Sequence, residues 1–136
     1  MGRFAKLVDR SVHTIRWYEA QGLLPRVDRD AGGRRVYEPG HLEHFLFLDR
    51  MRRTGMSIAD MRRLTELSME GWRTLEARMA MLREHRAEIE AQIRELTGAL
   101  EQIDAKTAFY EDWVRNKRRP PKEAEHAPAR RAPTRA

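Results

Sequence analysis

The fold of this chain is decided by one stretch, SVHTIRWYEAQGLLP, at residues 11–25. Ser11 is of the type that caps helix N-termini and Gly22 of the type that ends helices, so the stretch predicts a short helix between them. Pro25 cannot continue that helix and favours an extended conformation in the residue before it. A brief apolar stripe at residues 4–8 precedes it. The sequence therefore predicts two short helices around a tight turn.

A two-stranded ribbon is expected next. Residues 30–33, Asp-Ala-Gly-Gly, are typical of a tight turn. They separate two short runs, one carrying Val27 and the other Val36. Arg34 and Arg35 lie directly after the turn, so the tip of the ribbon should be basic.

Two longer helices follow, each with a recognisable start. Pro39 suits the first turn of a helix that ends at Gly55, and Ser57 with Asp60 three residues later begins another. Apolar residues recur in both at spacings of three and four. These are Leu42, Phe45, Leu46, Leu48 and Met51 in the first, and Met61, Leu64 and Leu67 in the second. Residues 1–70 are therefore predicted to form one small domain.

Residues 71–114 are predicted to form a coiled-coil dimerisation helix. Residues 72–114 contain no proline and one glycine. Seam positions alternate spacings of four and three, which is typical of a left-handed coiled coil. They are Leu75, Met79, Leu82, Arg86, Ile89, Ile93, Leu96, Leu100, Ile103, Thr107 and Tyr110. Such a helix spans roughly 64 Å at about 1.5 Å per residue, too long for the first domain to cover, so the seam needs a partner chain.

The charge of the chain is unevenly distributed. Residues 1–65 carry a net charge of +5, residues 66–114 of −5 and residues 115–136 of +6. Basic ends around an acidic middle favour a polyanionic partner for the ends, while ordinary solubility charge is the alternative. Residues 115–136 are also rich in proline and poor in apolar residues, so we expect a disordered basic tail.

Several classes of function are disfavoured. The chain has no cysteine, which excludes disulfides, thiolate metal sites and cysteine nucleophiles. Nucleophile–base pairs, phosphate loops and metal motifs are not recognisable, so we expect neither an enzyme nor a cofactor. With no long apolar run and no signal-like segment, we expect a cytoplasmic protein without a membrane partner.

Two weaker candidates for a sensing site remain. One is a histidine site, although histidines on the surface are the default; its members would be His41, His44, His85 and His126. The other is a small apolar pocket, although core residues are the commoner role of such side chains. Its lining would come from Met51, Met56, Met61, Met69, Trp72, Met79 and Met81.

The order helix, turn, helix and ribbon suits DNA. A helix is slim enough to enter the major groove, and basic side chains beside it fix its register on phosphates. The predicted DNA-binding residues are Ser11, His13, Thr14, Arg16, Trp17 and Tyr18 on the helix, Arg34, Arg35 and Tyr37 on the ribbon, and Arg52 and Arg53 at the end of the following helix. Trp17 and Tyr18 fit the core as well, since Tyr18 follows Ile15 at the spacing of the buried face.

Residues 4–25, 32–37 and 51–57 closely resemble the MerR family of bacterial transcription regulators. The resemblance covers roughly residues 2–67 by motif and the long helix by architecture. It implies a mainly α protein with a winged helix-turn-helix DNA-binding domain and a homodimer formed through an antiparallel coiled coil. It also implies a palindromic operator in double-stranded DNA, often between promoter elements, which activators of the family distort for RNA polymerase.

The resemblance also assigns roles to single residues. It places His13, Thr14, Arg16, Trp17 and Tyr18 in the recognition helix, Arg35 and Tyr37 in the wing, and a phosphate contact at Arg52. His13 stands where the family usually has Arg or Lys, and Trp17 where it usually has Tyr.

Metal, superoxide and electrophile sensors of the family look to be built on cysteines, which this chain lacks, so the identity of its effector stays open, as does the choice between activator and repressor. Two rival functions also remain. One is an architectural or excision accessory protein with the same winged domain. The other is a coiled-coil scaffold whose basic ends grip nucleic acid or acidic membrane without sequence preference.

Overall fold

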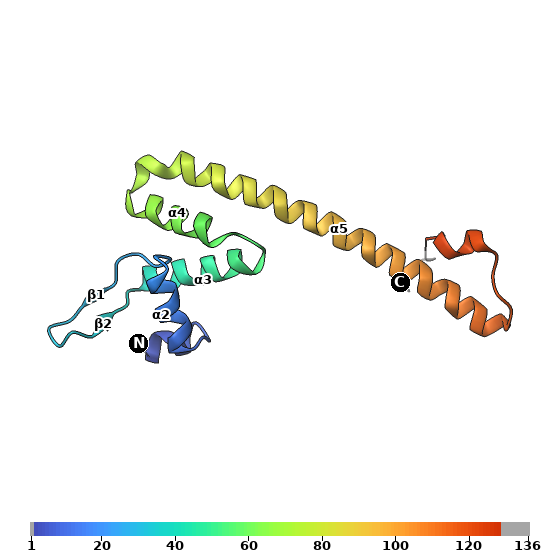
Figure 1. Cartoon of the computed structure of the whole chain (residues 1–136), viewed down its shortest axis with the longest axis horizontal. Coiled ribbons are helices and arrows are strands. Elements are labelled where there is room, and N and C mark those ends of the chain that lie inside the picture. Colours follow the sequence, from blue (N-terminus) through green and yellow to red (C-terminus); the bar gives the residue numbers. More distant parts are fainter. Residues whose placement is uncertain (1, 129–136) are drawn as a thin grey trace, which may run out of the picture. The chain divides into compact units, whose positions relative to one another are not determined.

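The structure is a computed structural model that describes residues 2–128. Helices dominate the described chain, and a short antiparallel ribbon extends beside them (Figure 1). The elements are α1 (Gly2–Leu7), α2 (Val12–Ala20), β1 (Asp28–Arg29), β2 (Arg35–Val36), α3 (Pro39–Arg53), α4 (Ile58–Met69), the 3-10 turn η1 (Trp72–Thr74), α5 (Leu75–Asn116) and the 3-10 turn η2 (Lys122–His126). The chain divides into two compact units, the first of which ends at Arg86.

The helix starts predicted from capping residues are confirmed. The Ser11 hydroxyl accepts the Thr14 N–H at 3.1 Å, and the Ser57 hydroxyl accepts the Asp60 N–H at 3.0 Å. Each bond satisfies a backbone donor that the first turn of a helix leaves unpaired. Gly22 follows α2 with a φ of 69°, a left-handed conformation that glycine adopts without steric cost.

The predicted ribbon is also confirmed. Asp28 pairs with Val36 and Arg29 with Arg35. Its turn is held by the Asp30 carboxylate, which accepts the N–H groups of Gly32 and Arg34, both at 2.9 Å. Such side-chain bonds are the reason why Asp favours tight turns, while Gly33 supplies the positive φ, 76°, that the turn requires.

The core of the first unit lies between α1, α2, α3 and α4. Its fully buried side chains include Ile15, Tyr18, Leu23, Phe45, Leu48 and Met61. Met81 and Leu82 of α5 pack against this core, and His85 Nε2 lies 2.8 Å from Thr54 Oγ1 at the end of α3. These contacts explain why the first unit extends to Arg86, beyond the domain end predicted at residue 70.

The second unit contains most of α5. Ile93, Leu96, Leu100 and Ile103 of the predicted seam are 56–65% exposed. Phe109, on another face of the helix, is buried. Large apolar side chains are thus left uncovered along the seam of the single chain.

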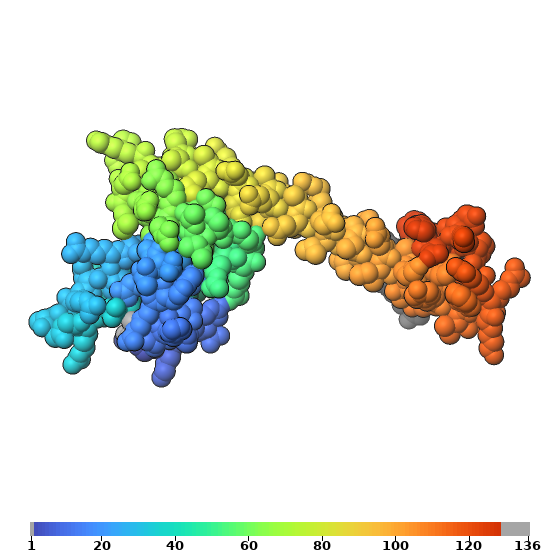
Figure 2. All heavy atoms as spheres, in the orientation of Figure 1, coloured from blue at the N-terminus to red at the C-terminus, as the bar shows by residue number. Residues whose placement is uncertain are grey.

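The described part of the predicted tail is more ordered than composition indicates. Helix α5 runs on to Asn116, and η2 follows beside it (Figures 1 and 2). Lys106 forms an ion pair with Glu125, and Pro120 is buried. Residues 117–128 therefore contact α5 through the buried Pro120, the Lys106–Glu125 ion pair and a cation–π contact between Arg119 and Trp113. Residues 129–136 of the tail lie outside the described residues.

Within the described chain, the helices are either too short or too polar to cross a membrane.

Candidate nucleic-acid interface

Helix α2 exposes most of the side chains predicted to meet DNA. Ser11, His13 and Arg16 are exposed, and Thr14 and Trp17 are half-buried. The Ser11 hydroxyl caps the helix and lies 2.9 Å from Thr14 Oγ1, so its position is fixed by the fold. The first two turns of α2 therefore present a hydroxyl, an imidazole and a guanidinium to solvent.

Tyr18, by contrast, lies in the core. Its ring contacts Phe45 at 4.7 Å between centroids and Trp17 at 5.4 Å. Its hydroxyl donates to Asp49 Oδ1 at 3.3 Å. Burial raises the pKa of the Tyr18 phenol. The side chain thus holds α2 against α3. This is the alternative that its spacing from Ile15 indicated, a core residue and not a direct DNA contact.

The last turn of α3 brings basic residues beside α2. It carries Arg50, Arg52 and Arg53, a favourable place for cations because the C-terminal end of a helix is electrically negative. The Arg52 guanidinium lies 5.3 Å from the centre of the Trp17 ring, a cation–π contact. Arg52 and Arg53 are both exposed. Trp17 is therefore a platform for Arg52 as well as a neighbour of the core.

The two arginines predicted to meet DNA from the ribbon differ in their surroundings. Arg34, directly after the turn, is exposed, whereas Arg35 donates to the Glu19 carboxylate of α2, with 2.6 Å between Nε and Oε2. Tyr37 stacks on Phe4 of α1 at 4.3 Å. The ribbon is therefore tied to α2 through Arg35 and to α1 through Tyr37.

His41 anchors the base of the ribbon to α3. Its Nδ1 accepts the Glu38 N–H at 2.9 Å, so the ring proton is on Nε2, which donates to the Arg26 carbonyl oxygen at 3.0 Å. The ring is buried, and these two hydrogen bonds leave neither of its nitrogens without a partner.

The expectation that the histidines lie on the surface is wrong for His41 and His85. Both are buried, His41 on two backbone partners and His85 beside the Thr54 hydroxyl. His44 lies 2.8 Å from Thr65 Oγ1, and burial lowers its pKa. Among the described residues, no three His, Asp or Glu side chains are grouped as metal ligands.

The methionines considered for a sensing pocket are divided between core and surface. Met56 and Met61 are buried, whereas Met69 and Met79 are exposed and Trp72 is 76% exposed. Met51 and Met81 pack against the same core as Met56 and Met61, so the structure brings together four of the seven side chains and leaves the other three on the surface.

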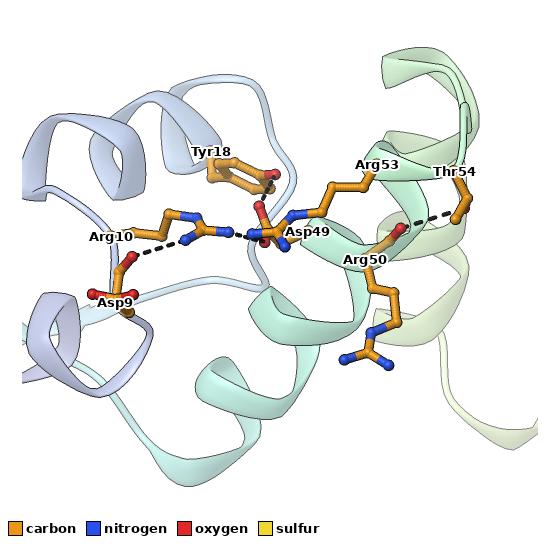
Figure 3. A network of polar contacts seen from close by, with 7 residues as sticks. All are labelled: Asp9, Arg10, Tyr18, Asp49, Arg50, Arg53 and Thr54. Carbon is orange, nitrogen blue, oxygen red and sulfur yellow. Dashed lines mark hydrogen bonds and ion pairs between the residues drawn. The ribbon is translucent and has the colours of Figure 1, made fainter. Parts of the chain in front are cut away.

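Two functional candidates escape sequence reasoning. Arg10 precedes α2, and Asp49 lies one turn before the end of α3. Figure 3 shows the Asp49 carboxylate between Arg10, Tyr18 and Arg53. No short-range pattern marks this cluster, since Arg10 and Asp49 are 39 residues apart.

Comparison with known proteins adds the evidence of relatives. Residues 1–67 match the family described as "MerR HTH family regulatory protein", and residues 42–106 match "MerR, DNA binding". An uncharacterized HTH-type transcriptional regulator of Haemophilus influenzae is 34% identical over 107 residues, 79% of each chain. The chain belongs to the MerR family. Another relative, the transcriptional regulator CueR of Vibrio cholerae, is 30% identical over 84% of this chain and 77% of its own.

Solved structures of MerR-family proteins share this fold. A MerR-family regulator from Listeria monocytogenes superposes with a TM-score of 0.80 at 33% identity, covering 85% of this chain and 88% of its own. HiNmlR, a family regulator lacking the sensor domain and bound to promoter DNA, superposes with a TM-score of 0.73 at 31% identity. That match covers 85% of this chain and 91% of HiNmlR. Membership of the family makes this chain a DNA-binding transcription regulator.

Proposed function

We propose that this regulator binds a palindromic operator as a homodimer and acts by distorting promoter DNA. The observation that carries the proposal is the arrangement around α2. Exposed His13 and Arg16 on this helix are accompanied by basic side chains from two other elements, the ribbon and the end of α3. A helix that enters the major groove needs phosphate contacts of this kind to fix its register.

The proposed contacts fall into two groups. Arg16, on the exposed side of α2, reaches a base edge, with His13 and Thr14 near the same groove. The phosphate-contacting residues are Ser11 and Trp17 on α2, Arg34, Arg35 and Tyr37 on the ribbon, and Arg52 and Arg53 on α3. Tyr18 supports this surface from the core, with its hydroxyl directed at Asp49.

The proposed dimer uses the seam of α5. Its four exposed apolar side chains from Ile93 to Ile103 are supporting evidence, because a soluble helix gains by burying such a row against a second copy. Two copies related by a twofold axis would present two α2 helices, which is the symmetry of a palindrome.

The proposed function places the protein at a promoter in the bacterial cytoplasm, where RNA polymerase is a further partner. HiNmlR, which is described as lacking the sensor domain, was crystallised with promoter DNA. The identity of an effector for this chain stays open.

The test compares two arginine variants on the operator and on random DNA. The operator is first selected from a random DNA library. Arg52→Ala should weaken binding to both DNAs and lower the salt slope by about one unit per lost phosphate contact. Arg16→Ala should weaken operator binding alone, by about 1–3 kcal/mol for a lost base contact. Affinities come from fluorescence anisotropy at several salt concentrations.

The wild-type protein decides between the proposal and the scaffold alternative. A regulator prefers its selected operator over random DNA, whereas a non-specific scaffold binds both equally. Equal losses on both DNAs for Arg16→Ala would remove this residue from the base-contacting set.

A further inference from the structure

We propose that Asp49 is a positioning residue that sets the preference of this interface for operator over random DNA. The inference rests on the proposed function, since it concerns how the same surface discriminates between DNA sequences. It assigns a role to an acidic side chain that lies among the cations of this surface.

The Asp49 carboxylate is a junction of three elements. Its Oδ2 accepts from Arg10 at 2.7 Å and forms an ion pair with Arg53 at 3.0 Å, while its Oδ1 accepts from the Tyr18 hydroxyl at 3.3 Å. Figure 3 shows these groups converging on it from different parts of the chain. Arg10 also donates to the carbonyl oxygen of Asp9, so the turn between α1 and α2 is joined to α3.

These contacts hold the recognition helix at its two ends. Arg10 lies just before the Ser11 cap of α2, and Tyr18 lies near its end. The Asp49 side chain is 14% exposed and that of Arg10 is 26% exposed, so the pair is partly shielded from solvent. Charge-assisted hydrogen bonds are stronger than neutral ones, which suits a carboxylate that must fix the angle of α2 on α3.

The same carboxylate weakens attraction to DNA of any sequence. Random DNA is bound through phosphates, and each phosphate that is bound requires an available cation. Arg53 is 62% exposed yet is paired with Asp49, and Arg10 is paired with it as well. Asp49 therefore restrains two cations beside α2 while it orients the helix that selects the sequence.

Asp49→Asn separates these effects from a simple loss of fold. The amide keeps the shape of the side chain and an oxygen for Tyr18, but it no longer holds the two arginines by charge. For each additional phosphate that a released arginine binds, affinity for random DNA should rise by roughly eightfold at 0.1 M salt, and the salt slope should steepen by about 0.9. Operator binding should rise less, so the operator preference should fall, by up to about eightfold for each such phosphate.

Glu43→Gln is the matched control. It removes the same charge from an exposed position of the same helix, outside the Asp49 cluster. The control should leave the operator preference unchanged. Arg10→Gln tests the junction from its other side. It should lower the operator preference without raising affinity for random DNA. Adding Asp49→Asn to it should raise that affinity only through Arg53, so the effects of the two substitutions should not be additive.

The outcomes distinguish the possibilities, with melting temperatures recorded for every variant. Equal increases in affinity for operator and random DNA in Asp49→Asn would make Asp49 a plain surface charge and overturn the inference. Equal decreases with a lower melting temperature would make its role only structural, and would overturn it too. An unchanged operator preference in Arg10→Gln would also overturn the inference. Equal binding of the wild-type protein to all sequences would instead refute the proposed function, and the inference with it.

Discussion

Replacing Leu96 by Asp in the middle of α5 should separate the dimer into monomers. Leu96 is 65% exposed in the single chain, and Ile93, Leu100 and Ile103 are 56–61% exposed. Burying a whole Leu or Ile side chain contributes about 1.5–3 kcal/mol, so the uncovered part of each is worth about 1–2 kcal/mol. Eight such side chains in a dimer contribute about 8–16 kcal/mol, enough to offset the association cost of about 4–15 kcal/mol.

The substitution acts twice, once in each protomer. It removes about 2–4 kcal/mol of apolar burial from the dimer and adds two carboxylates that lose water on association. Since about 1.4 kcal/mol corresponds to a factor of ten, the dissociation constant should rise by at least about a hundredfold. Ala91→Asp, at an exposed position outside the seam, introduces the same charge and should leave the dimer intact.

The measurement is the molar mass by sedimentation equilibrium or light scattering over a range of concentrations. Circular dichroism of the same samples reports whether α5 stays helical when the seam is broken. Two results would refute the reasoning. One is a wild-type protein that is a compact folded monomer, and the other is a Leu96→Asp dimer with the dissociation constant of Ala91→Asp.

Two further predictions concern pH and the C-terminal segment. Burial lowers the pKa of His44 below its ordinary 6.5, so the unfolded chain binds the extra proton more readily. The free energy of unfolding should therefore fall as the pH drops below about 6.5, by at most about 1.4 kcal/mol per pH unit, and His44→Gln should flatten this dependence in urea titrations. Truncation after Asn116 removes a net positive charge, so affinity for operator and random DNA should fall in proportion and the salt slope should become shallower, as fluorescence anisotropy would show. An unchanged affinity and slope would leave the segment without a role in DNA binding.

Local chemistry explains why much of the fold could be predicted. Ser11 and Ser57 cap their helices through bonds to residues three positions later, and Asp30 closes its turn over similarly short separations. Such bonds depend on the neighbouring sequence alone. The seam of α5 is likewise a spacing pattern along one helix, and its exposed apolar residues lie where that pattern indicates.

The polar connections of the interface could not be predicted in the same way. Arg35 pairs with Glu19 across 16 residues and Arg10 with Asp49 across 39, although several other acidic residues lie nearer to each arginine in sequence. Which partner it meets depends on the tertiary fold. The burial of His41 has the same origin, because its Nε2 is satisfied by the Arg26 carbonyl oxygen at the base of the ribbon.

The interface combines cations for DNA with carboxylates that restrain them. Glu19 stands beside Arg35 of the ribbon as Asp49 stands beside Arg53 of α3, and both arginines are proposed phosphate contacts. A phosphate that approaches either arginine must compete with a carboxylate already in place. Random DNA contacts this surface through its phosphates alone, whereas an operator also contacts α2 through base edges. Weaker phosphate binding alone would lower the affinity for every sequence equally and leave the operator preference unchanged. The preference therefore depends on the orientation of α2, which the Asp49 carboxylate also fixes and which only the base contacts of an operator require.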